Sequence, residues 1–159
     1  MKTLLFTLMS FLCLSISACS KNDGNLTNNP TVTNPTDSTN TSESMNLIIT
    51  INNTAFTATL LDNASAKAFK ALLPMTLTMN ELNNNEKYAD LPNSLPTNAS
   101  NPGIIQNGDL MLYGNNVLVL FYKTFSTSYS YTKIGKIDNT EGLTTALGTG
   151  NPTVKFELE

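Results

Sequence analysis

Residues 110–122 have the sequence LMLYGNNVLVLFY, and this stretch decides the fold class of the chain. Two apolar runs flank Gly114-Asn115-Asn116, which are residue types that form tight turns between antiparallel strands. Both runs are continuously apolar and four to six residues long, as in strands that lie fully inside a protein. The stretch therefore predicts a β-hairpin at the centre of the core.

The sequence on both sides of this hairpin also has the features of β-strands. Apolar residues alternate with Thr or other polar residues, which is the two-residue period that buries one face of a strand. An Asn52-Asn53 pair after the first of these segments predicts a tight turn. The chain is therefore predicted to be mainly β. The predicted strands are residues 47–51, 56–60, 75–79, 133–137 and 154–158.

Two short helices are predicted to interrupt the strands. The first covers residues 64–72 and is ended by Pro74, because the residue before a proline avoids the helical region. The second begins at Asp138, with Glu141 three residues later as its capping-box partner, and ends at Gly148.

Composition excludes several classes of chemistry. The chain of 159 residues has no His and no Trp, and all nine of its basic residues are lysines. Ser–His and Cys–His catalytic pairs, His-ligated metals and guanidinium forks are therefore impossible. The acids show no metal-loop spacing, so no metal site and no cofactor are expected. The formal net charge of −3 argues against nucleic acid as a partner.

Residues 1–18 have the features of a bacterial lipoprotein signal peptide. Lys2 precedes an apolar segment, residues 3–17, that is shorter than the roughly 20 residues needed to span a bilayer. The segment Ile16-Ser17-Ala18-Cys19 resembles a lipobox, in which the thiol receives a diacylglyceryl group and further acylation, for example with palmitate. The alternative is an ordinary secretory signal that is cut after Ala18. Acylated Cys19 would anchor the chain in a membrane.

Residues 19–45 consist of this cysteine followed by a segment rich in Ser, Thr, Asn and Pro. The segment has no aromatic residue, so it predicts a disordered tether.

The residue after the cysteine bears on localisation. Ser20 at this position resembles the pattern of lipoproteins that Gram-negative bacteria sort to the outer membrane. We therefore expect a lipid-anchored protein of the bacterial cell envelope, on the periplasmic face of the outer membrane or on the cell surface. Residues 46–159 would form one monomeric domain.

Three blocks of this domain resemble the small bacterial and archaeal proteins with a cyclophilin-like fold. They are DN…AF…LLPMTL in residues 62–77, NEKY…LP…LP in residues 85–96, and GDLMLY…SYSYT…GKID in residues 108–138. The resemblance implies a closed β-barrel of about eight strands with a short helix over each open end. The strands and helices predicted from the residues agree with that architecture.

The same resemblance bears on catalysis. Cyclophilins that isomerise X–Pro bonds use an arginine, with a Trp and a His at the rim of the proline pocket. The segment Gln106-Asn107-Gly108-Asp109 is similar to the Gln-Gly-Gly-Asp of that superfamily, but this chain supplies none of the three residues. No catalytic residue is assigned. The favoured interpretation is a non-enzymatic binding module, and the alternative is a divergent peptidyl-prolyl isomerase of the envelope.

The best candidate ligand site is the aromatic connection after the hairpin. Tyr and Ser side chains offer apolar faces with hydroxyls at their edges, as small-ligand pockets require. The alternative is that these hydroxyls simply solvate a connection. The candidate residues are Tyr113, Lys123, Ser128, Tyr129, Ser130 and Tyr131. Lys123 would be the nearby charge and would favour an anionic or carbonyl-bearing ligand, whether a small molecule, a peptide or a glycan.

A second candidate site lies in residues 83–108, which are rich in Asn and Pro and predict a long loop. Glu86, Lys87 and Tyr88 would place a carboxylate and an ammonium group at the mouth of a cleft. The alternative is a solvent-exposed ion pair that orders the loop and contributes little to stability.

Overall fold

The computed structural model describes residues 45–159, which contain eleven strands and two helices. The predicted signal peptide, Cys19 and all of the predicted tether except Met45 lie outside this part. Within it, neither helix is long and apolar enough to cross a membrane. The elements are β1 (Asn46–Ile51), β2 (Thr54–Leu60), α1 (Ala64–Lys70), β3 (Met75–Thr78), β4 (Asn80–Leu82), β5 (Glu86–Asp90), β6 (Ile104–Ile105), β7 (Asp109–Tyr113), β8 (Val117–Phe121), β9 (Phe125–Ser126), β10 (Thr132–Ile137), α2 (Leu143–Leu147) and β11 (Thr153–Leu158).

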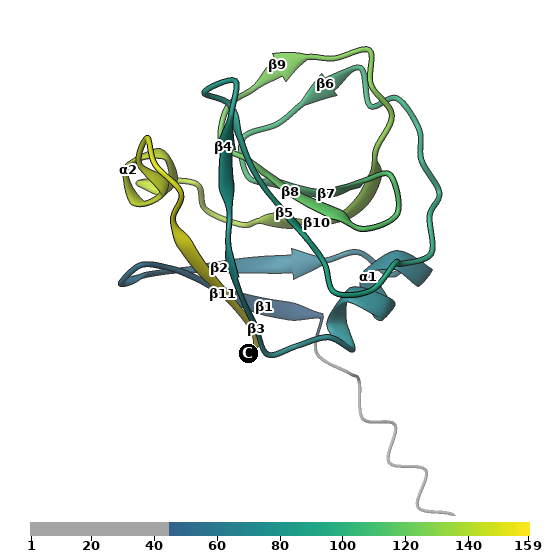
Figure 1. Ribbon diagram of the computed structural model, residues 1–159, viewed down its shortest axis with the longest axis horizontal. Coiled ribbons are helices and arrows are strands. Elements are labelled where there is room, and N and C mark those ends of the chain that lie inside the picture. Colours follow the sequence, from purple (N-terminus) through teal and green to yellow (C-terminus); the bar gives the residue numbers. More distant parts are fainter. Residues whose placement is uncertain (1–44) are drawn as a thin grey trace, which may run out of the picture. The chain divides into compact units, whose positions relative to one another are not determined.

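The main sheet is antiparallel and curls into a barrel (Figure 1). Its strand order is β3-β11-β1-β2-β10-β7-β8-β5-β4. The two end strands, β3 and β4, are separated only by Met79 and follow one another along a single run of chain. β3 pairs with β11 and β4 pairs with β5, so residues 75–82 act as one bent strand that joins the two ends. Counted in this way, the barrel has the eight strands predicted.

The central hairpin is buried on both faces, which accounts for its continuous apolar sequence. On β7, Leu110 and Leu112 belong to the core of the barrel, whereas Met111 belongs to a second apolar cluster outside it. On β8, Leu120 faces inward and Phe121 faces the outer cluster.

A short ribbon formed by β6 and β9 covers this outer cluster. Figure 1 shows the two strands standing apart from the barrel, beyond β7 and β8. Ile105 from β6 is fully buried, and Phe125 from β9 packs against the same cluster. The ribbon therefore adds a second layer over one side of the barrel.

Helix α1 confirms the first predicted helix, although it ends at Lys70. The side-chain oxygen of Asn63 caps it by accepting a hydrogen bond from the Ala66 backbone N–H at 2.8 Å. Phe69 is buried, and its ring lies edge-on to the ring of Phe156, with centroids 5.7 Å apart. The helix is therefore fixed to the barrel through its apolar face.

Helix α2 is shorter than predicted, and the capping box expected at Asp138 and Glu141 is wrong. Asp138 lies directly after β10, and its carboxylate accepts a hydrogen bond from the Thr59 hydroxyl at 2.9 Å. The helix begins after Gly142, whose φ of 78° is left-handed and favours glycine. The side chain of Asp138 is therefore used by β2 and is not available to the helix.

The long loop predicted over residues 83–108 is also wrong, because β5 lies within it. Asn83 and Asn84 both have positive φ, as in the tight turns that join hairpin strands, and they connect β4 to β5. Lys87 points into the barrel, so β5 lacks the apolar alternation by which a strand is recognised. The predicted loop site therefore lies on a strand of the barrel.

Candidate functional site

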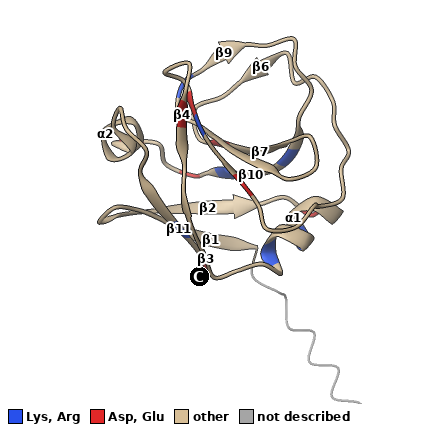
Figure 2. Cartoon of the chain, in the orientation of Figure 1, with Lys and Arg blue, Asp and Glu red and all other residues tan. Residues whose placement is uncertain are grey.

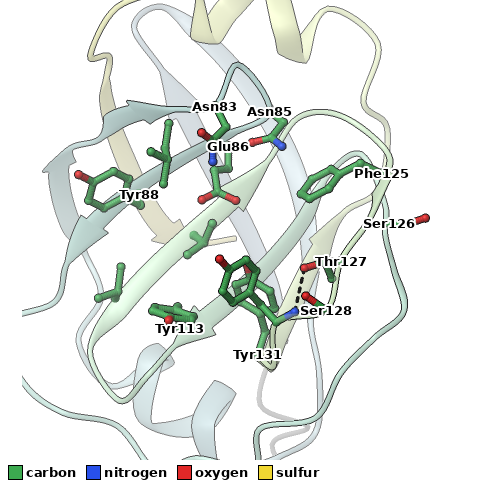
Figure 3. Close-up of a pocket in the computed structure, with 14 residues that line it drawn as sticks. Asn83, Asn85, Glu86, Tyr88, Tyr113, Phe125, Ser126, Thr127, Ser128 and Tyr131 are labelled. Carbon is green, nitrogen blue, oxygen red and sulfur yellow. Dashed lines mark hydrogen bonds between the residues drawn. The ribbon is translucent and has the colours of Figure 1, made fainter.

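A pocket of about 560 Å³ opens on the outer side of the barrel. Its walls come from the β4–β5 turn, from the outward faces of β5, β7 and β8, and from the connection at residues 125–131 (Figure 3). It lies beside the outer apolar cluster, and the two share five residues: Tyr88, Val117, Val119, Phe125 and Tyr131.

The pocket brings together parts of both sites predicted from the sequence. From the aromatic connection it takes Tyr113, Ser128, Tyr129 and Tyr131, and from the segment that forms β5 it takes Glu86 and Tyr88. Lys87, Lys123 and Ser130 are not among the residues that line it. The two predicted sites are therefore two walls of one pocket.

Three tyrosine rings form one wall. The ring of Tyr113 lies 5.7 Å from that of Tyr131 and 6.3 Å from that of Tyr129, measured between centroids. Tyr131 is 6% exposed and packs edge-on against Phe121, whereas Tyr113 and Tyr129 are 47% and 62% exposed. Tyr131 therefore forms the base of this wall, and the other two tyrosines form its rim.

Backbone hydrogen bonds hold this wall in place. Tyr131 exchanges two backbone hydrogen bonds with Ser100, each 3.0 Å long. The Thr127 hydroxyl accepts a hydrogen bond from the Tyr129 backbone N–H at 3.1 Å, drawn as the dashed line in Figure 3. Burial, together with the nearby carboxyl of Glu86, raises the pKa of the Tyr131 phenol to about 12. The phenol is therefore neutral throughout the physiological range.

Glu86 faces the tyrosine wall from β5. Successive residues of a strand point to opposite faces, so Glu86 and Tyr88 face the pocket while Lys87 and Ala89 face the barrel. Figure 3 shows the Glu86 carboxyl pointing into the pocket. Glu86 as a whole residue is 8% exposed, and its carboxyl has no hydrogen bond or ion pair among residues 45–159. Burial, and secondarily the charge of Glu81, raises the pKa of Glu86.

Lys87 is turned the other way and is fully buried in the barrel. Its ammonium group forms an ion pair with Glu81 and donates hydrogen bonds to the carbonyls of Gly148 and Gly150, at 2.9 and 2.6 Å. Tyr122 donates a hydrogen bond to the same Glu81 carboxylate at 2.9 Å. Figure 2 shows acidic and basic positions together where β4 meets β5. Lys87 is therefore paired with Glu81 and not with Glu86.

Hydrogen bonds from this network also determine the titration of Glu81. Burial alone would raise the pKa of its carboxyl. The hydrogen bonds from Lys87 and Tyr122 outweigh that effect and hold the pKa below its usual value. Glu81 is thus a carboxylate with hydrogen-bond donors beside it, whereas Glu86 is a buried carboxyl that has no donor among residues 45–159.

Lys123 lies away from the pocket. Its ammonium nitrogen is 5.9 Å from the centroid of the Tyr122 ring, and Tyr122 faces the barrel core. The charge that the structure places in the pocket is the acid Glu86, not the lysine expected from the sequence.

Comparison with known proteins agrees with this architecture. A protein-family model described as "Cyclophilin-like family" matches residues 49–159. The chain belongs to the cyclophilin-like family. A solved structure of similar fold is the solution structure of a hypothetical protein from Archaeoglobus fulgidus, which has 19% sequence identity and a TM-score of 0.50. The similarity covers 73% of this chain and 95% of that one. No curated protein matches the chain.

Several pocket residues of this cyclophilin-like domain were not found from the sequence. Val117 and Val119 line the floor because they lie on the outward face of β8. The sequence of this strand is apolar throughout, so it does not show which residues face outward. Asn83 and Asn85 line the upper wall, and nothing in an Asn-rich chain distinguishes them. The side-chain oxygen of Asn85 is buried and has no hydrogen-bond partner in the described part of the chain.

The pocket of this cyclophilin-like domain combines apolar area with hydrogen-bond acceptors. Four tyrosines and Phe125 supply rigid aromatic surface, while the Glu86 carboxyl supplies acceptor oxygens that have no donor among residues 45–159. Within residues 45–159, no three acidic, cysteine or histidine side chains lie close enough to hold a metal ion. The arrangement is suited to binding an organic molecule.

Proposed function

We propose that the cyclophilin-like domain is a non-enzymatic binding module whose ligand occupies the pocket over β5, β7 and β8. The observation that carries this proposal is the buried Glu86 carboxyl, which has no partner in the described part of the chain and lies within an aromatic pocket of about 560 Å³. Small-molecule sites are typically about 300–1,000 Å³, mostly apolar, with a few converging polar groups. These features favour a small organic molecule over a peptide or glycan chain.

The test is a screen of small organic fragments against the isotope-labelled full chain, followed by two-dimensional NMR. Fragments that bind should shift signals of the tyrosine wall and of β5. Tyr129→Ala should weaken the binding of such fragments at least severalfold, because this rim ring is 62% exposed and contributes contact area rather than core packing. Leu61→Ala, at an apolar position that is 43% exposed and lies outside the pocket, is the control. Fragment shifts confined to other surfaces would contradict the proposal.

We further propose that the domain is tethered to the bacterial envelope through lipidated Cys19. The support is the lipobox-like sequence Ile16-Ser17-Ala18-Cys19 after a short apolar segment. Cys19→Ala should leave an unprocessed or soluble protein that takes up no acyl label. Unchanged membrane fractionation and labelling of this variant would show that anchoring does not depend on the cysteine.

A further inference from the structure

We infer that the ligand of this pocket carries a cationic nitrogen group with N–H donors, such as a primary ammonium group, bound against Glu86. This inference rests on the proposed function, because it specifies the chemical class that the same pocket accepts. It differs from the anionic or carbonyl-bearing ligand that Lys123 suggested from the sequence.

The first argument is the missing counter-charge of Glu86. The side chain is more than nine-tenths buried and points into the pocket (Figure 3). No lysine of residues 45–159 lines the pocket, and the adjacent Lys87 is held on the other side of β5 by Glu81 and two carbonyls. A buried carboxylate is unfavourable unless it is paired, so a cationic ligand would supply the partner that the protein omits.

The second argument is the set of aromatic rings around the carboxyl. Figure 3 shows the rings of Tyr88 and Phe125 on the two sides of Glu86, with Tyr113 and Tyr131 across the pocket from it. The faces of aromatic rings are electron-rich and attract cations, most strongly where water is excluded. The faces of the same rings do not attract an anion, which Glu86 would also repel.

The third argument concerns hydrogen bonding. The Glu86 carboxyl accepts no hydrogen bond from residues 45–159. Burying an acceptor without a donor is costly. An ammonium group has N–H donors for this carboxyl, whereas a quaternary ammonium group has none.

The experiment compares three probes of similar size and different charge: benzylammonium, benzyl alcohol and benzoate. Each is titrated into the full chain at neutral pH, and binding is followed by NMR shifts of the tyrosine wall. Benzylammonium should bind about tenfold more tightly than benzyl alcohol, and benzoate should bind most weakly. Benzyltrimethylammonium, which lacks N–H donors, should bind more weakly than benzylammonium.

Glu86→Gln removes the charge and keeps the side-chain size, so benzylammonium should bind this variant no better than benzyl alcohol does. Glu141→Gln makes the same change of charge at an exposed position outside the pocket, and it should retain the preference. Benzyl alcohol or benzoate binding as tightly as benzylammonium to the unmodified chain would overturn the inference and leave pocket binding intact. Failure of benzylammonium to shift any pocket residue would also overturn it, and the fragment screen would then decide on the proposed function separately.

Discussion

Lys87 shows how one residue stabilises both a strand and a loop. Its buried ammonium group has three acceptors, namely the Glu81 carboxylate and the carbonyls of Gly148 and Gly150. Burying a charge is costly, and removing one partner of a buried pair leaves the other uncompensated. The lysine therefore ties β5 both to β4 and to the turn after α2.

Replacing this lysine with an apolar residue of similar length should be strongly destabilising. Lys87→Met should lower the free energy of unfolding by about 3–5 kcal/mol, because Glu81 loses its charged partner and two carbonyls lose a hydrogen-bond donor. Urea denaturation measures the loss. Lys136→Met, at an exposed position on β10, should change stability by less than about 0.5 kcal/mol. Similar effects of the two substitutions would mean that the buried network does not stabilise the fold.

Glu86 should make the stability of the fold fall as the pH rises, whereas a paired acid makes it increase. Its pKa is raised in the folded state, so ionisation opposes folding as the pH rises above the ordinary carboxyl value of about 4.3. Glu86→Gln should therefore stabilise the domain at pH 7, and this advantage should vanish below pH 4.

Urea denaturation of the unmodified chain and of Glu86→Gln at both pH values tests this expectation. Two groups interact electrostatically with Glu86, namely Glu81 and Tyr131. The pKa of Glu81 is lowered, so this carboxylate contributes stability above the ordinary carboxyl pKa in both proteins. The pKa of Tyr131 is about 12, so this phenol does not titrate at either pH. An advantage that grows toward acid pH would contradict the burial of Glu86.

At the scale of elements, the β7–β8 hairpin separates residues that stabilise the fold from residues available to a ligand. Phe121 is fully buried and contacts Tyr131 and Phe125, with ring centroids 5.3 and 5.8 Å apart. Phe121→Ala should cost about 3–5 kcal/mol as a core truncation. Tyr129→Ala should cost less than about 0.5 kcal/mol, because its ring is mostly exposed. Thermal unfolding of the two variants measures both losses. If Tyr129→Ala left the domain unfolded, the Tyr129 ring would have to belong to the core.

Elements were predictable from the sequence where apolar residues follow a period of two or form a continuous run. The hairpin over residues 110–121 and the strands at the two ends of the domain met that condition. β5 did not, because Lys87 occupies an inward position. The start of α2 was missed because the side chain of Asp138 binds Thr59 on a strand far away in the sequence.

The candidate site was predictable only in part, for a related reason. Tyr113, Tyr129 and Tyr131 were assigned to one site because they lie in the hairpin and in the connection that follows it. The pairing of β10 with β7, which places Thr132 opposite Leu112, brings the three rings together. The approach of Glu86 to these rings depends on the register of β5 with β8, which pairs Glu86 with Phe121. Glu86 and Phe121 are 35 positions apart, so no local pattern in the sequence indicates that they pair.

At the scale of the whole molecule, membership of the cyclophilin-like family raises the question of isomerase activity. The chain has no Arg, Trp or His with which to reproduce the familiar prolyl site. We expect no acceleration of Ala-Pro isomerisation in a protease-coupled assay with the full chain. A rate enhancement that survives purification and is abolished by Glu86→Gln would favour the enzyme over the binding module.

The position of β11 has a consequence for how the domain is made. β11 pairs with β1 on one side and with β3 on the other, so a strand near the C-terminal end joins two strands near the start of the barrel. During synthesis, or during passage through a narrow translocation channel with its N-terminus leading, the chain presents β1 and β3 long before their shared partner emerges. The barrel cannot close until almost the whole domain is through, so an exported chain would stay in the unfolded state that such a channel accepts.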